Sequence, residues 1–164
     1  MSATTLKRPP QIQQGKNECW AAALSSWIKA TENKSTVGTL FPTVQSLKNL
    51  MGDFCTASGQ LDIKWGFQLL ASMVNMDYRI IKPKQLDPVW LQGKLKSKGH
   101  IYMLYSGWDL GAPNTVGHAC VLYHVDTASP AWVAVMDPWP GEGYRSRWVY
   151  QYRQCHEMVM GWPR

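Results

Sequence analysis

Apolar positions in the first part of the chain repeat at the three- and four-residue spacing of an α-helix. The residues that form this apolar face are Trp20, Leu24, Trp27 and Ile28. We expect the helix to begin at Asn17, acting as its N-cap, and to run to about Ala30. The same periodicity predicts further helices over 43–51, 59–75 and 87–99. The amino-terminal half of the chain is therefore expected to be mainly helical.

After residue 100 the pattern changes to short apolar or alternating runs that are typical of β-strands. We expect strands over 78–81, 101–105, 119–125, 132–136 and 148–153. Helices followed by an antiparallel meander indicate an α+β domain with two lobes. Residues 1–10 are polar and end in two prolines, which predicts a flexible N-terminal tail. We expect residues 11–164 to form a single domain.

Length and composition fit one folded domain. The chain has 164 residues, of which 45% are hydrophobic and 17% are charged, and this composition excludes a disordered protein. No run approaches the roughly 18 consecutive apolar residues that a membrane span needs. The first residues lack the apolar segment of a secretory signal peptide. We therefore expect a protein made in the cytoplasm without a signal peptide and without a membrane span.

The charge balance is basic, with 17 Lys and Arg residues against 11 Asp and Glu residues and a formal net charge of +6. Such a charge favours anionic partners in general. The basic residues are scattered, however, and no nucleic-acid-binding motif accompanies them. We therefore expect no nucleic-acid partner.

The four cysteines have no Cys-x-x-Cys spacing and no neighbouring residues in the usual pattern of zinc ligands, so we expect no metal site. Cys55, Cys120 and Cys155 are interpreted as buried, inert thiols. If Cys19 stays free, at most one disulfide can form among the other three. Cys19 differs from them because it is expected within the first turn of a helix.

A helix N-terminus carries roughly half a positive charge, which favours the thiolate that acts as a nucleophile. A nucleophilic cysteine also needs a base, a group that orients the base, and donors for an oxyanion. His118 follows a long loop and opens a strand, so it is the predicted base. Asp137 ends the next strand, where a hairpin would bring it near His118 as the orienting carboxylate. Gln13 precedes Cys19 by six residues, and its amide can donate to the oxyanion beside the Cys19 backbone N–H.

Other residues compete for these roles. His124 is an alternative base, because six residues along one strand place it on the same side as His118. Asp126 is an alternative orienting group. We expect His100 and His156 to be surface residues or to have their hydrogen bonds satisfied.

At these residues the chain resembles the papain-like cysteine peptidases. The order Gln, Cys, His, Asp is theirs, and Cys19-Trp20 looks like their Cys-Trp signature. Asp137-Pro138-Trp139 is similar to their Asn-x-Trp, in which the tryptophan covers the hydrogen bond between histidine and asparagine. Here the third member is Asp.

Three short segments resemble the compact bacterial branch of this superfamily, which includes effector peptidases of plant pathogens and peptidases that cut double-glycine leaders. These segments are Cys19-Trp20-Ala21-Ala22, Gly117-His118-Ala119 and Asp137-Pro138-Trp139-Pro140. Gln14-Gly15 also looks like a papain Gln-Gly pair, but it lies one residue too close to Cys19, so the spacing favours Gln13.

The resemblance implies a papain-like α+β fold. A helical lobe carrying Cys19 would pack on an antiparallel β-sheet lobe carrying His118 and Asp137. Trp20 and Trp139 would pack at the active site. The implied activity is that of a cysteine peptidase that cleaves a protein or peptide substrate through an acyl-enzyme, without a cofactor or a metal.

The short chain, the absence of a signal peptide and of a pro-region before Gln13, and the likeness to effector peptidases together suggest a bacterial effector or toxin. We expect such a protein to reach a target cell through a secretion system, with a delivery or carrier domain and an immunity or inhibitor protein as partners. The same triad also serves cell-wall amidases, deamidases and transglutaminases. A papain-fold module that binds without cutting is the non-catalytic alternative.

Overall fold

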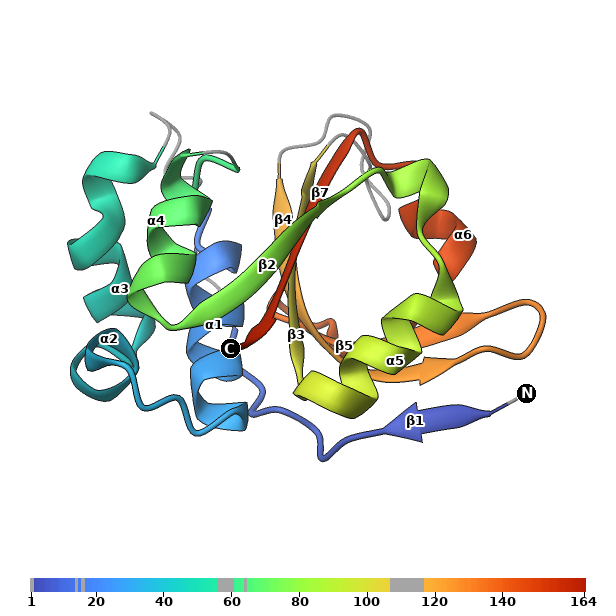
Figure 1. Ribbon diagram of the computed structural model, residues 1–164. Coiled ribbons are helices and arrows are strands. Elements are labelled where there is room, and N and C mark those ends of the chain that lie inside the picture. The colour runs from blue at the N-terminus through green and yellow to red at the C-terminus, as the bar shows by residue number, and fades with distance from the viewer. Residues whose placement is uncertain (1, 14, 16, 56–60, 64, 107–116) are drawn as a thin grey trace.

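The computed structural model describes residues 2–13, 15, 17–55, 61–63, 65–106 and 117–164. Four helices gather on one side of a large sheet and form the helical lobe (Figure 1). They are α1 (Cys19–Ala30), α2 (Thr36–Leu40), α3 (Val44–Met51) and α4 (Trp65–Met73), with a short 3₁₀ turn, η1 (Gly52–Phe54), after α3. Among the described residues, no helix has the length and apolar character that crossing a membrane requires.

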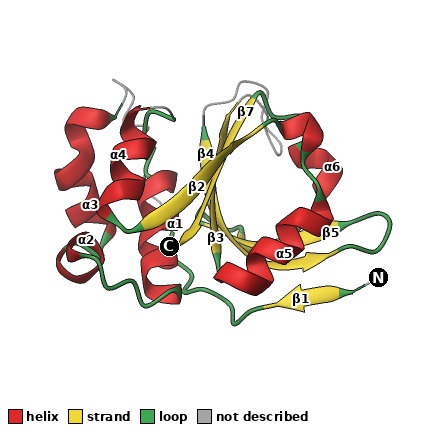
Figure 2. Ribbon diagram, in the orientation of Figure 1, coloured by secondary structure: helices red, strands yellow, loops and turns green. Residues whose placement is uncertain are grey.

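The second lobe is a seven-stranded antiparallel sheet with the order β2-β7-β3-β4-β5-β6, and β1 pairs with β4 outside this path. The strands are β1 (Ala3–Thr5), β2 (Met76–Ile81), β3 (Ile101–Ser106), β4 (His118–Asp126), β5 (Trp132–Asp137), β6 (Gly143–Trp148) and β7 (Glu157–Pro163). The helices α5 (Pro88–Lys98) and α6 (Val149–Tyr152), with the 3₁₀ turn η2 (Pro83–Gln85), lie on the side away from α1 (Figure 2).

Strand β4 is buried on both faces, which explains its continuous apolar run. Ala119 and Val121 belong to the core between the sheet and α1, while Cys120 and Leu122 belong to a second core on the other face. Alternate residues of a strand point to opposite faces, so one strand serves both cores. The start of this strand, at His118, is thereby held between two packed layers.

Helix α1 spans Cys19–Ala30, so Cys19 is its first residue, within the first turn as expected. Its N-cap is Glu18, however, and not Asn17, which takes a left-handed backbone conformation with φ 59°. Glu18 makes no cap hydrogen bond through its side chain, because its carboxylate bonds the Gly15 N–H and Lys48.

One of the predicted strands is wrong. Residues 148–153 were expected as a strand, but β6 ends at Trp148 and α6 follows. The Gln151 side chain accepts the Trp148 backbone N–H and favours this turn of helix. Trp65, the first residue of α4, is 79% exposed, while Phe67, Leu70 and Ala71 of the same helix are buried. Part of the helix expected over 59–75 lies outside the described residues.

The amino-terminal segment lies against both lobes, which differs from the flexible tail expected for residues 1–10. Strand β1 pairs with β4, and Thr5 lies opposite His124. The backbone that follows makes four further hydrogen bonds. The Leu6 N–H donates to the Tyr123 carbonyl. The carbonyls of Lys7, Pro9 and Pro10 bond the side chains of His100, Tyr144 and Ser26, respectively. We call residues 2–10 the N-terminal strap.

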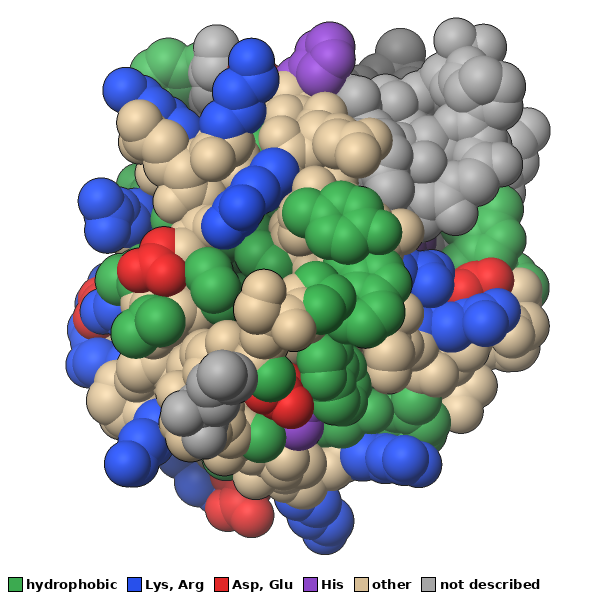
Figure 3. Space-filling model, turned by 90° about the vertical axis from the view of Figure 1, so that its right-hand side faces the viewer, with side chains coloured by type: hydrophobic (Ala, Val, Ile, Leu, Met, Phe, Trp, Pro, Cys, Tyr) green, Lys and Arg blue, Asp and Glu red, His purple; other side chains and the backbone are tan. Residues whose placement is uncertain are grey.

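On the face that Figure 3 shows, Lys and Arg side chains are scattered among hydrophobic and acidic ones. Trp148 and Tyr150 are exposed, and their rings are stacked 6.5 Å apart. The basic charge of the chain is therefore spread over this face and does not gather into one patch.

Candidate active site

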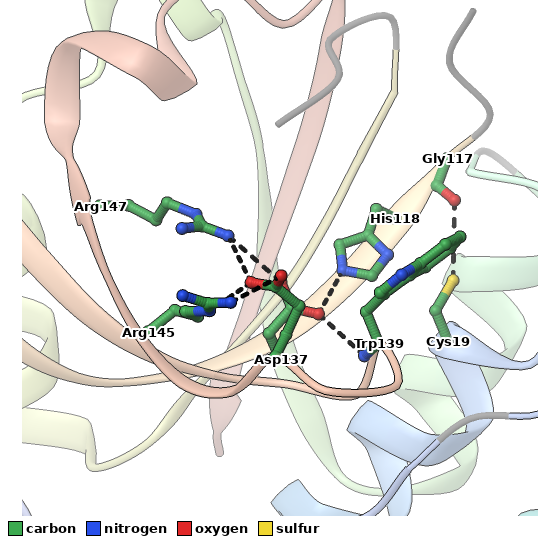
Figure 4. A network of polar contacts seen from close by, with 8 residues as sticks. Cys19, Gly117, His118, Asp137, Trp139, Arg145 and Arg147 are labelled. Carbon is green, nitrogen blue, oxygen red and sulfur yellow. Dashed lines mark hydrogen bonds and ion pairs between the residues drawn. The ribbon is translucent and has the colours of Figure 1, made fainter. Parts of the chain in front are cut away.

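Cys19 begins α1 and lies beside the start of β4. Its side chain is buried, and Sγ donates a hydrogen bond to the carbonyl oxygen of Gly117 at 3.6 Å (Figure 4). The thiol lies close enough to His118 to help raise the pKa of its imidazole. The N–H groups in the first turn of a helix have no partner within the helix. The helix start therefore supplies donors and positive potential close to the sulfur.

His118 is the first residue of β4, opposite Tyr105 of β3. Its Nε2 lies 2.8 Å from Oδ1 of Asp137. This bond leaves Nδ1, on the Cys19 side of the ring, to exchange a proton with the thiol (Figure 4). The Tyr105 ring packs edge to face against the imidazole, with ring centroids 5.7 Å apart, and helps to hold it in place.

Asp137 ends β5 and is only 3% exposed. Its Oδ1 accepts hydrogen bonds from His118 Nε2 and from the Trp139 backbone N–H at 3.0 Å. Its Oδ2 lies 4.0 Å from Nη2 of Arg147. The β4–β5 hairpin thus brings together the two residues that the sequence predicted as base and orienting group.

The charges of this pair support one another. Burial alone lowers the pKa of His118, but the hydrogen bonds to Asp137 and Cys19, with their charges, outweigh it and raise the pKa to about 10. Burial raises the pKa of Asp137, whereas His118, the Trp139 N–H and Arg147 together hold it below its ordinary value. At neutral pH the pair is therefore an imidazolium beside a carboxylate.

The two tryptophans of the predicted site differ in their surroundings. Trp20 is buried in the core between the sheet and α1, and its carbonyl accepts a hydrogen bond from the Tyr102 hydroxyl at 3.2 Å. Trp139 is 55% exposed, and its ring meets His118 edge to face at 6.2 Å. Trp139 therefore covers one side of the imidazole, while Trp20 fixes the helix that carries Cys19.

Gln13 lies in the irregular segment before α1 with its side chain exposed. Within the described part of the chain, no hydrogen bond joins its amide to Cys19, so the oxyanion role of Gln13 stays a prediction. Gln14, the competing glutamine, lies outside the described residues.

The alternative base, His124, points away from the site. A β-bulge between Leu122 and His124 shifts the alternation, so the expectation that it faces the same side as His118 is wrong. It is instead hydrogen-bonded to the Thr5 hydroxyl at 2.6 Å and stacked on Trp132. Asp126, at the far end of β4, accepts the Ala128 N–H in a turn.

The remaining histidines also lie outside the triad. His100 is buried, and its Nε2 bonds the Lys7 carbonyl at 2.7 Å. His156 is exposed. No group of three or more His, Cys, Asp and Glu side chains that could hold a metal ion occurs among the residues that the structure describes.

Two site residues were missed by sequence reasoning. Arg147 on β6 and Glu142 in the β5–β6 turn lie behind Asp137, with Arg147 Nη2 3.1 Å from Glu142 Oε2. The signal was present in the alternation Arg145-x-Arg147, since an arginine on a strand next to Asp137 can reach its carboxylate.

No protein-family model matches the sequence, and no curated protein matches it. Among the solved structures that share its fold are two peptidase domains. One is the peptidase domain of Streptococcus ComA, a bi-functional ABC transporter involved in a quorum-sensing pathway. It superposes with a TM-score of 0.60 and 15% identity, over 96% of this chain and 100% of that chain. The other is the peptidase domain of Streptococcus mutans ComA in complex with a small-molecule inhibitor. Its TM-score is 0.52 and its identity 12%, over 94% of this chain and 99% of that chain. The papain-like α+β fold expected from the sequence is thereby confirmed.

Proposed function

We propose that this protein is a cysteine peptidase. The observation that carries the proposal is the arrangement in Figure 4, where Cys19 at the start of α1 is bonded to Gly117 beside His118, and His118 is bonded to Asp137. A nucleophile, a base that can reach it, and a third group that orients the base are what covalent acyl transfer requires. The fold shared with two peptidase domains supports the same conclusion.

In the proposed mechanism, Cys19 Sγ attacks the carbonyl carbon of the scissile bond while His118 holds the thiol proton as imidazolium. Asp137 fixes the ring and stabilises its charge. The backbone N–H of Cys19 and the Gln13 amide donate to the oxyanion of the tetrahedral intermediate. His118 then gives its proton to the leaving amine as the carbon–nitrogen bond breaks. Water, deprotonated by His118, hydrolyses the thioester and restores the thiol.

Alkylation with iodoacetamide, followed for each cysteine by peptide mass spectrometry across pH, tests the nucleophile. Burial raises the pKa of Cys55, Cys120 and Cys155, the last to about 12, so these thiols are internal controls. We expect Cys19 alone to react readily at pH 6, and His118→Ala to abolish that reactivity. Cys19 as slow as Cys155 would contradict the proposal.

Cleavage of denatured casein tests the activity itself. We expect turnover by the native chain and none by Cys19→Ala, while Cys55→Ala, whose thiol is half-buried and hydrogen-bonded to the Met51 carbonyl, retains it. Reactive Cys19 without cleavage of any protein or peptide would favour a different acyl acceptor, as in the amidases, deamidases and transglutaminases.

We further propose that the peptidase acts as a bacterial effector or toxin, delivered by a secretion system and countered by an immunity protein. The likeness of the Cys-Trp, Gly-His and Asp-Pro-Trp segments to effector peptidases supports this role. Expression in bacteria, directed to the cytosol or to the periplasm, tests it with Cys19→Ala as control. Toxicity in the cytosol indicates a protein target, toxicity only in the periplasm a cell-wall target. Equal toxicity of Cys19→Ala would indicate a binding module.

A further inference from the structure

Arg147 is a charged side chain enclosed behind the candidate site. It lies on β6 opposite Val133 of β5, and directly opposed residues share a face, so it points to the same side as Asp137. Its side chain is only 16% exposed. Its Nε is buried and has no hydrogen-bond partner among the residues that the structure describes. A guanidinium in such a place is costly unless a nearby charge compensates for it.

Two carboxylates compensate for the charge of Arg147. Its Nη2 lies 3.1 Å from Glu142 Oε2 and 4.0 Å from Asp137 Oδ2. Figure 4 shows the guanidinium on the side of Asp137 that faces away from His118. Glu142 also binds Arg145, at 2.8 Å from its Nη2 to Oε1. Glu142 is therefore the anchor that holds Arg147 near the aspartate.

The two carboxylate oxygens of Asp137 have different partners. Oδ1 accepts from both His118 and the Trp139 N–H, whereas Oδ2 faces Arg147. A carboxylate that is 3% exposed would either take up a proton or turn toward another donor if nothing compensated for its charge. The charge of Asp137 is compensated on the Oδ1 side by the His118 imidazolium and on the Oδ2 side by Arg147, whereas an asparagine at this position would need neither.

We propose that Arg147 is a positioning residue of the catalytic site, held by Glu142, that keeps Asp137 ionised and turned so that Oδ1 meets His118 Nε2. The catalytic part of this inference rests on the proposed peptidase function. Arg147 touches no reacting atom and acts only through Asp137. Arg145, two residues away on the same strand, is bound to the same Glu142 but forms no ion pair with Asp137 among the described residues, so it is the matched control.

The test measures the pKa of His118 by NMR titration of the 164-residue chain labelled at histidine, with His118→Ala to identify the signal. The ionisable or charged groups that bear on the ring are Cys19 from α1, Tyr105 from β3, Asp137 from β5 and Arg147 from β6. If Arg147 positions Asp137, Arg147→Gln lowers the pKa of His118 by about one pH unit or more, because the ring loses its carboxylate partner. Arg145→Gln leaves the pKa unchanged.

The direction of the change decides between explanations. If Arg147 were only a distant positive charge, its removal would raise the pKa of His118. A raised or unchanged value in Arg147→Gln therefore overturns the proposal. In an Asp137→Asn background, Arg147→Gln is expected to change nothing further, whereas a purely structural role would disturb both backgrounds alike.

Glu142→Gln is the second variant, and it decides the matter if Arg147→Gln does not fold. It leaves Arg147 in place without its anchor, and we expect a fall in the pKa of His118 in the same direction. No fall in folded Glu142→Gln overturns the proposal in that case. The titration needs no substrate, so it separates the two inferences. Absence of peptidase activity contradicts the proposed function, while the NMR result alone decides the role of Arg147.

Discussion

Asp137 in the sheet lobe and Gln13 beside the helical lobe represent two halves of one candidate site, and their surroundings differ. Asp137 is buried, and both its oxygens face donors or positive charge from the hairpin and the next strand. Gln13 is exposed in irregular chain before α1. The sheet half is thus organised in advance by neighbours close in sequence, since residues 132–148 form two paired strands joined by one turn.

The helical half depends on contacts that are distant in sequence. Cys19 reaches the sheet through Gly117 and His118, about 100 residues later in the chain. The carboxylate next to it, on Glu18, pairs with Lys48 in a partly exposed ion pair. The comparison teaches that the base and its orienting group form one local unit, whereas the position of the nucleophile is set by the packing of two lobes.

The largest expected effect lies in the sheet half. Asp137→Ala leaves Arg147 enclosed without one of its two carboxylates and His118 without its partner, so we expect a loss of about 3–5 kcal/mol in unfolding free energy. Turnover should fall by about 10²–10⁴. Urea denaturation and casein cleavage measure these effects. The matched variant in the helical half, Glu18→Ala, should cost less than about 1 kcal/mol, because its ion pair is partly exposed. Equal losses of unfolding free energy in Asp137→Ala and Glu18→Ala would contradict the proposed difference between the two halves of the site.

A smaller effect is expected at Gln13. If its amide donates to the oxyanion, Gln13→Ala lowers kcat by about 10²–10³ and leaves the alkylation rate of Cys19 unchanged, because alkylation forms no oxyanion. Gln11→Ala, an exposed glutamine two residues earlier, serves as the control. A turnover for Gln13→Ala equal to that of Gln11→Ala would leave the helical half without its predicted side-chain donor.

The third expected effect is a pH dependence set by the sheet half. His118 must carry a proton to protonate the leaving amine, and its pKa is raised to about 10. We expect kcat/KM to fall about tenfold per pH unit above this value. Because the folded-state pKa lies above the ordinary 6.5, the charged ring stabilises the fold fully below about pH 6.5, and this contribution is lost as pH rises through about 10.

Asp137→Asn sharpens this prediction. It removes the carboxylate charge that helps to raise the pKa of His118, so the alkaline limb should move to lower pH. Circular dichroism at pH 10 checks that the fold persists during the assay. An alkaline limb that is the same in native protein and Asp137→Asn would show that the pair does not control it.

The candidate site was readable from the sequence because each of its main residues ends or begins an element. Cys19 starts a helix with clear apolar periodicity, and His118 and Asp137 lie at strand ends of one hairpin. Such positions follow from local pattern and antiparallel pairing alone. Arg147 was missed because its role depends on the register of the third strand in the meander.

The parts that failed depend on contacts that no short window contains. The bulge at Leu122/His124 changes which face His124 occupies, and only the paired strands show it. Residues 157–163 form an interior strand of the sheet, β7, which was not predicted from the sequence. Its partners β2 and β3 lie beside it in the sheet but far from it in the chain. The alternating aromatic residues at 148–153 do not share one environment, because Trp148 and Tyr150 are exposed while Tyr152 is buried.

The N-terminal strap limits how far the two lobes can separate. Thr5 is fixed on β4 and the Pro10 carbonyl on Ser26 of α1, so a tether of about five residues joins the lobe of His118 to the helix of Cys19. Fully extended, such a tether spans no more than about 18 Å, and its two prolines reduce its slack further. The strap thereby acts as a link of finite extensibility. Thermal motion that would carry the two attachment points apart by more than this length has to break hydrogen bonds at one end of the link first.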